Sequence, residues 1–114
     1  MGGTDFPIPD VADIRLMDVL RTLSDPGRVL MLTVLSDGEF HPCTPDAFGL
    51  DLQKSTLSHH LKTMREAGLT VTRVTGRNYG VRLRVDDLES RFPGLIDSLT
   101  SPAALADLRQ QLGD

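Results

Sequence analysis

The segment KSTLSHHLKTMREAGLTVTRVTGRNYGVRLRV, residues 54–85, decides the fold of this 114-residue chain. Its first half carries an apolar stripe with spacings of four and three residues, formed by Leu57, Leu61 and Met64. Spacing of this kind places apolar side chains on one face of a helix. It therefore predicts an amphipathic helix over about 54–67, and Gly68 follows as a typical C-terminal stop signal.

The second half of the segment predicts a β-hairpin. Apolar and polar residues alternate over 69–74 and again over 79–85, as they do in half-buried strands. The turn residues Thr75-Gly76-Arg77-Asn78 separate the two runs. We call the expected hairpin, about residues 69–85, the wing.

Opposite its apolar stripe, the predicted helix presents short hydrogen-bonding groups. Small hydroxyls, an imidazole and a lysine suit close approach to base edges in the major groove. At the tip of the wing, a guanidinium and an amide suit the phosphate backbone or a minor groove. The candidate nucleic-acid-binding residues are Lys54, Ser55, Thr56, Ser58, His59, Lys62, Arg73, Arg77 and Asn78. The alternative interpretation is a solvated helix face and a turn that serves only solubility.

The distribution of charge favours a nucleic-acid partner, although the average does not. The formal net charge is −4, which by itself argues against such a partner. Residues 54–84, however, hold seven basic residues and one acid, whereas the rest of the chain carries a net charge of −10. A basic face on an acidic body can concentrate phosphate contacts. A chance cluster of solvated charges is the other interpretation.

Helices are also predicted on both sides of this segment. Apolar residues at three-residue spacing predict one helix over 11–23, and Ser24-Asp25-Pro26 ends it and starts a second, well-buried helix that runs to Leu35. Thr44-Pro45-Asp46 starts a short helix to about Leu50 by the same signals. Residues 39–43, which lie between the second helix and this short helix, predict an irregular connector.

The order of elements predicts a mainly α fold with a small β-hairpin, a winged helix-turn-helix. We expect a flexible N-terminal segment, 1–10, and a single domain, 11–114, that ends in helices over about 86–112. No apolar run is long enough to span a membrane, and the N-terminus lacks the pattern of a signal peptide. A lone cysteine permits no internal disulfide, so we expect a cytoplasmic protein.

Catalysis is not expected from this sequence. It contains no triad-like spacing, glycine-rich phosphate loop or cluster of metal ligands. His59 and His60 are adjacent on the predicted helix and point about 100° apart, which makes them a poor chelating pair. His60 falls toward the core edge, where we expect it to pack and hydrogen-bond. The alternative function is a winged-helix module that binds an acidic protein, although the outward hydroxyls and His59 favour a DNA groove.

Several motifs together resemble the ArsR/SmtB, or arsenic-repressor-like, family of bacterial regulators. Residues 23–30, LSDPGRVL, resemble the opening motif of the family, and residues 54–61, KSTLSHHL, resemble its recognition helix. Residues 65–69, REAGL, resemble the exit from that helix, and residues 76–79, GRNY, resemble the family's wing. The resemblance implies a homodimer, built from the helices over 11–23 and about 101–112, that binds an imperfect palindromic operator. It further implies that such a protein usually represses transcription until an inducer weakens binding, and that Ser58 and His59 touch bases.

The resemblance carries over no metal site. Arsenic and cadmium sensors of the family have a cysteine pair at the start of the short helix, where this chain has only Cys43. Zinc and nickel sensors need His and acidic ligands on the C-terminal helix, where this chain has no His. No cofactor is therefore predicted, and a metal ion or other inducer is left open. His41 and Cys43 are candidate sensor residues, as two ligands or as a thiol switch between subunits, and a merely packed cysteine is the alternative.

Overall fold

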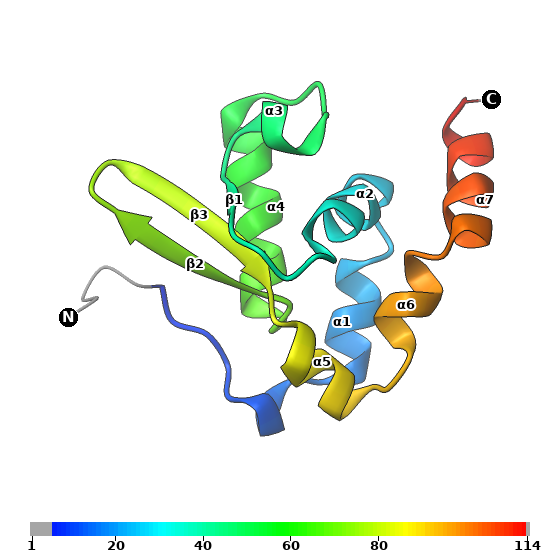
Figure 1. Ribbon diagram of the computed structural model, residues 1–114, viewed down its shortest axis with the longest axis horizontal. Coiled ribbons are helices and arrows are strands. Elements are labelled where there is room, and N and C mark those ends of the chain that lie inside the picture. The colour runs from blue at the N-terminus through cyan, green and yellow to red at the C-terminus, as the bar shows by residue number, and fades with distance from the viewer. Residues whose placement is uncertain (1–5, 114) are drawn as a thin grey trace.

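The computed structural model describes residues 6–113, and these form a mainly helical fold with a small antiparallel sheet (Figure 1). A short 3-10 helix, η1 (Val11–Asp13), comes first. In chain order, the remaining elements are α1 (Leu16–Thr22), α2 (Pro26–Leu35), β1 (His41–Pro42), α3 (Pro45–Phe48), α4 (Lys54–Glu66), β2 (Thr70–Thr75), β3 (Asn78–Leu83), α5 (Val85–Arg91), α6 (Leu95–Leu99) and α7 (Pro102–Gly113). The predicted winged helix-turn-helix is confirmed. Within residues 6–113, no helix is long and apolar enough to cross a bilayer.

The helix-turn-helix is formed by α3 and α4, α2 precedes it, and local sequence signals set the boundaries of these helices. At the start of α2, the Asp25 carboxylate accepts a hydrogen bond from the backbone N–H of Arg28 at 3.2 Å, and Pro26 occupies the first turn. Gly49 ends α3 with a φ of +64°, and a short turn leads to α4. The structure thus ends α3 about two residues earlier than the sequence suggested, because Gly49 takes the left-handed conformation of a helix terminus.

The apolar stripe of α4 forms the centre of the core. Leu57, Leu61 and Met64 are 7 % exposed or less. They belong to one cluster of buried side chains with α2 and the sheet, whose other members include Met31, Leu32, Leu35, Leu69, Val81 and Leu83. Burial of this stripe fixes which side of α4 faces inward, and therefore which side faces solvent.

The sheet has three strands in the order β1-β3-β2, all antiparallel. In the wing, Thr70 pairs with Leu83 and Thr75 pairs with Asn78 across a two-residue turn. The expectation of an irregular connector over 39–43 was wrong, because His41 and Pro42 pair with Val81 and Gly80 of β3. A strand of two residues has no detectable periodicity, and its hydrogen-bonding partner lies far along the chain.

The predicted first helix over 11–23 was also wrong, because the chain is extended between η1 and α1. Ile14, in this break, has an extended backbone and a fully buried side chain. Its carbonyl accepts hydrogen bonds from Nε and Nη2 of Arg91 at 3.2 and 2.7 Å. These tertiary contacts compete with the backbone bonds that a continuous helix would make, so α1 has only seven residues.

The expected flexible segment, 1–10, is anchored over the part that the structure describes, and its residues 1–5 lie outside the described range. Arg84 Nη1 donates to the carbonyl of Pro9 at 2.8 Å, and the Arg65 guanidinium lies 4.3 Å from the centre of the Phe6 ring. Residues 6–10 therefore pack along the wing and α4. At the other end of the chain, three helices occupy the region predicted to be helical, and Ser101 Oγ accepts a hydrogen bond from the Ala104 N–H at the start of α7.

Candidate nucleic-acid interface

The outward face of α4 carries most of the predicted nucleic-acid-binding residues. Its exposed side chains include Lys54, Ser55, Thr56, Ser58, His59 and Lys62. The inward face buries Leu57, His60, Leu61 and Met64. No side-chain hydrogen bond caps the N-terminus of α4 at Gln53, so the first N–H groups of the helix are not occupied by a cap. Such groups, together with the positive end of the helix dipole, favour a phosphate nearby.

The wing projects from the body beside α4 and away from α7 (Figure 1). Gly76 takes a φ of +62° in its turn, and an added Cβ at this position would meet no atom within 4 Å. Arg77 and Asn78, which follow it, are both exposed. The tip therefore presents a guanidinium and an amide free of surrounding structure, as a contact with a DNA backbone or groove requires.

Arg73 lies lower on the wing, and Phe40 holds its side chain. The guanidinium of Arg73 lies 3.8 Å from the centre of the Phe40 ring, and that of Arg82 lies 5.1 Å from it. Gly80 pairs with Arg73 across the strands, and a Cβ added to Gly80 would lie 3.4 Å from Phe40 Cδ1. The ring thus rests against bare backbone beside two cations, and cation–π attraction restricts the Arg73 side chain.

Sequence reasoning missed Phe40 as a member of this site. It is a single aromatic residue in a connector, where no periodic pattern marks it. The available signal was the alternation of the wing, which places Arg73, Gly80 and Arg82 on one face of the hairpin with room for a ring above the glycine.

A hollow of about 740 Å³ lies between the start of α4, the segment 40–44 and the wing. Among the predicted residues, it brings together Lys54, Arg73, Arg77 and Asn78. Ser58, His59 and Lys62 do not line it and lie farther along the exposed face of α4. The predicted residues thus form two groups, one of hydrogen-bonding groups on the helix and one of mainly basic groups around the hollow.

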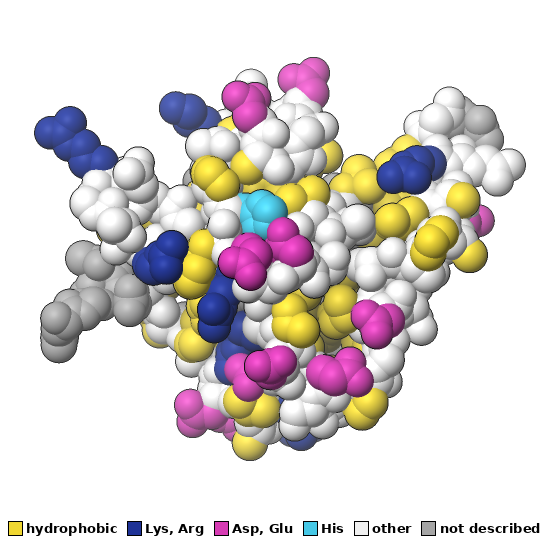
Figure 2. Space-filling view, in the orientation of Figure 1, with side chains coloured by type: hydrophobic (Ala, Val, Ile, Leu, Met, Phe, Trp, Pro, Cys, Tyr) yellow, Lys and Arg dark blue, Asp and Glu magenta, His cyan; other side chains and the backbone are white. Residues whose placement is uncertain are grey.

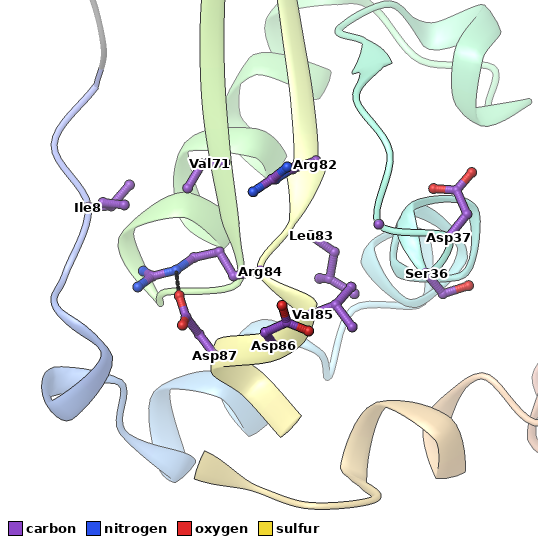
Figure 3. A pocket seen from close by; sticks show the side chains of 11 residues that line it. Ile8, Ser36, Asp37, Val71, Arg82, Leu83, Arg84, Val85, Asp86 and Asp87 are labelled. Atoms are coloured by element: carbon purple, nitrogen blue, oxygen red, sulfur yellow. Dashed lines mark hydrogen bonds and ion pairs between the residues drawn. The ribbon is translucent and has the colours of Figure 1, made fainter. Parts of the chain in front are cut away.

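Figure 2 shows the distribution of charge over one face of the molecule. On this face, most Lys and Arg side chains lie over the wing and near α4, whereas Asp and Glu lie over α5 and the region above it, and also over α3. A second hollow, of about 440 Å³ at the base of the wing (Figure 3), is lined by the carboxylates of Asp37, Asp86 and Asp87. Its buried Arg84 is already paired with Asp87 through a bond of 3.0 Å. This second hollow disfavours phosphate and does not extend the candidate interface.

The candidate sensor residues His41 and Cys43 are both engaged in the fold. His41 Nε2 lies 3.0 Å from both carboxylate oxygens of Asp37, and the pKa of Asp37 is lowered by the backbone N–H of Glu39 and by His41. Cys43 is half-buried against the core. Over residues 6–113, no group of three or more His, Cys, Asp or Glu side chains is placed to hold a metal ion. A sensing role for the pair stays a prediction.

We expect Cys43 to react slowly with thiol reagents. Burial raises the pKa of its thiol to about 11 from the ordinary 9.0, against a smaller opposing effect of the Arg65 charge. Since the thiolate is the nucleophile, a rise of this size leaves about a hundredfold less of it at pH 8. Reaction with a chromogenic disulfide, measured for native and denaturant-unfolded protein at pH 8, checks this. Equal rates in the two states would contradict it.

Comparison with known proteins places the same region in a regulator family. A family model described as "Bacterial regulatory protein, arsR family" matches residues 25–70, from the cap of α2 to the start of β2. The chain is similar to an uncharacterized HTH-type transcriptional regulator, YceK, of Bacillus subtilis, with 35 % identity over 71 % of this chain and 82 % of the relative.

Two further relatives have names that specify repression. The biofilm growth-associated repressor of Agrobacterium fabrum is 37 % identical over 75 % of this chain and 73 % of its own length. The arsenical resistance operon repressor of Staphylococcus xylosus is 35 % identical over 65 % of this chain and 70 % of its own length. All these names denote regulators, which confirms the prediction of a regulator rather than an enzyme.

Proposed function

Because the chain belongs to the ArsR family of bacterial regulatory proteins and is therefore a DNA-binding transcriptional regulator, we propose that it acts as a homodimeric repressor on an imperfect palindromic operator. The observation that carries this proposal is the polar, exposed face of α4 next to a basic wing. Two copies related by a two-fold axis would present two such faces to two half-sites of one operator.

In this proposal the candidate residues divide the work of recognition between base edges and phosphates. Ser58 and His59 on α4 contact base edges and discriminate sequence, each contact contributing about 1–3 kcal/mol. Lys62, Arg73 and Arg77 contact phosphates and supply affinity that depends on salt. Lys54 lies at the start of α4, and Asn78 lies at the tip of the wing. In the proposed complex, the DNA backbone would pass between these two side chains.

Unpartnered apolar side chains support the dimer. Leu16, Met17 and Leu20 of α1 are 44, 56 and 39 % exposed, and Leu112 of α7 is 52 % exposed. Figure 1 shows α7 standing at the side of the molecule opposite the wing. A hollow of about 390 Å³, lined by Leu23, Val29, Leu108 and Leu112 among others, separates α7 from the joint of α1 and α2. A second copy packed on this side would cover these apolar side chains.

The alternative, a winged helix that binds an acidic protein, is less well supported. The basic wing would fit either partner, but the relatives are named as transcriptional regulators and repressors. We place the protein in the cytoplasm, where its proposed operator lies.

Selection from random-sequence duplexes at about physiological salt tests the proposed function. The purified full-length protein is mixed with the duplexes, and the retained DNA is sequenced after several rounds. We expect an inverted repeat to be enriched. We also expect the protein that binds it to have the mass of a dimer in analytical ultracentrifugation. Weak, salt-sensitive binding without enrichment would contradict an operator-specific repressor.

Replacing Arg77 with alanine is expected to weaken binding to operator DNA and to scrambled DNA by the same factor. An exposed guanidinium at the tip of the wing supplies phosphate affinity and no sequence information. The slope of log affinity against log salt should therefore fall by about one unit. Fluorescence anisotropy at several salt concentrations measures both quantities, and Arg77→Lys, which keeps the charge, serves as the control. Loss of specificity with an unchanged slope would instead place Arg77 at a base edge.

A further inference from the structure

Arg28, near the start of α2, joins three helices of the domain. Its Nε donates a hydrogen bond to Nδ1 of His60 on α4 at 3.0 Å, and its Nη1 donates to the carbonyl of Thr22 at the end of α1 at 3.2 Å. Its backbone N–H is held by the Asp25 cap. His60 is 9 % exposed and Thr22 is 5 % exposed, so these polar contacts lie at the edge of the core.

The chemistry of this contact fixes the protonation state of His60. A guanidinium has only donors and keeps its charge at any ordinary pH. Nδ1 of His60 must therefore accept, which a neutral imidazole with its proton on Nε2 can do. An imidazolium has donors on both nitrogens, so protonation would remove the acceptor and place two positive charges side by side.

We propose that Arg28 and His60 are positioning residues for DNA recognition, whose hydrogen bond holds α4 against the joint of α1 and α2 so that Ser58 and His59 face the DNA. This inference rests on the proposed function. His60 directly follows His59 in α4, so a rotation or shift of the helix at His60 displaces the recognition face as well. Neither Arg28 nor His60 needs to touch DNA to have this effect.

The surroundings of His60 make the positioning sensitive to acid. Burial lowers the pKa of His60 from its ordinary 6.5; the Asp25 charge raises it, whereas the Arg28 and His59 charges lower it. Asp18 and Arg21, the charged residues of α1, pair with each other on its exposed surface. A depressed pKa means that the hydrogen-bonded arrangement is complete above about pH 6.5 and is lost as the pH falls through the lowered pKa.

The variant His60→Gln separates this role from that of the neighbouring histidine. A glutamine amide oxygen can accept the bond from Arg28, and the amide does not titrate in this range. Operator affinity is measured for wild type and variant at pH 7.5 and pH 5.5, and His59 is present in both proteins. At pH 7.5 we expect the operator affinities of wild type and variant to agree within about twofold. At pH 5.5 we expect the wild type to bind operator about three- to tenfold more weakly than the variant. A ratio of affinities that does not change with pH would overturn the proposal.

A second measurement needs neither DNA nor a variant. In an NMR titration of the free wild-type protein, the His60 ring should be unprotonated at Nδ1 at pH 7.5. The amide signals of Thr22, Ser58 and His59 should shift together with the apparent pKa of His60. Amide signals of Ser58 and His59 that do not shift with the titration of His60 would contradict the proposal. Failure of the duplex selection, by contrast, would count against the proposed function and leave the NMR result to decide the positioning role.

Discussion

Replacing Gly68 with alanine is expected to lower the free energy of unfolding by about 3 kcal/mol, or roughly 10 °C in Tm. Gly68 links α4 to β2 with a φ of +91°, a region that side chains with a Cβ rarely adopt. A Cβ at this position would also lie 2.7 Å from Cγ1 of the fully buried Ile14. Both backbone strain and overpacking therefore oppose the substitution. Thermal and denaturant unfolding of the two proteins measure the loss.

Gly49→Ala is the matched control for Gly68→Ala. Gly49 also has a positive φ, of +64°, but an added Cβ would meet no atom within 4 Å. The control should therefore lose only the conformational part, about 1 kcal/mol. Equal losses at the two positions would show that the contact with Ile14 does not matter.

The double substitution of Ser58 and His59 by alanine is expected to have the largest effect on operator binding. Both side chains lie on the exposed face of α4, and in the proposed complex each contributes about 1–3 kcal/mol of discrimination. The ratio of affinities for operator and scrambled DNA should fall about thirtyfold or more. Competition binding at fixed salt measures this ratio.

Two controls accompany this double variant. Glu66→Ala changes another exposed residue at the far end of the same helix and should leave the ratio unchanged. The salt slope of the double variant should also match that of wild type, because the phosphate contacts remain. A double variant that loses the same factor of affinity for operator and for scrambled DNA, with a reduced salt slope, would assign these residues to the DNA backbone instead.

Features that depend on local patterns could be predicted from the sequence. The stripe of Leu57, Leu61 and Met64 is buried as expected, and the alternating segments on either side of residues 76 and 77 form the wing. The start of α2 also follows its signals, since Asp25 and Pro26 act there as cap and first helical residue. In each case the relevant residues lie within a few positions of one another, so short-range periodicity and capping suffice.

Features that depend on distant partners could not be predicted. The strand β1 exists because His41 and Pro42 meet β3, and the break at Ile14 is stabilised by Arg91. For the candidate site, exposure of the α4 face followed from its periodicity. Two contacts could not be predicted in this way: the Phe40 ring beside Arg73, and the hydrogen bond between Arg28 and His60. Only the folded chain brings these residues together.

Arg84 and Arg91, which bond the carbonyls of Pro9 and Ile14, also bear on the order in which contacts can form in a newly made chain. Arg84 and Arg91 donate hydrogen bonds to carbonyls that lie 75 and 77 residues earlier in the chain. During translation those carbonyls leave the ribosome first, but their donors follow only after α4 and the wing have been made. The helix-turn-helix can thus assemble before the N-terminal segment docks. The carbonyls of Pro9 and Ile14 can therefore meet both of their donors only after Arg91, the last residue of α5, has been made.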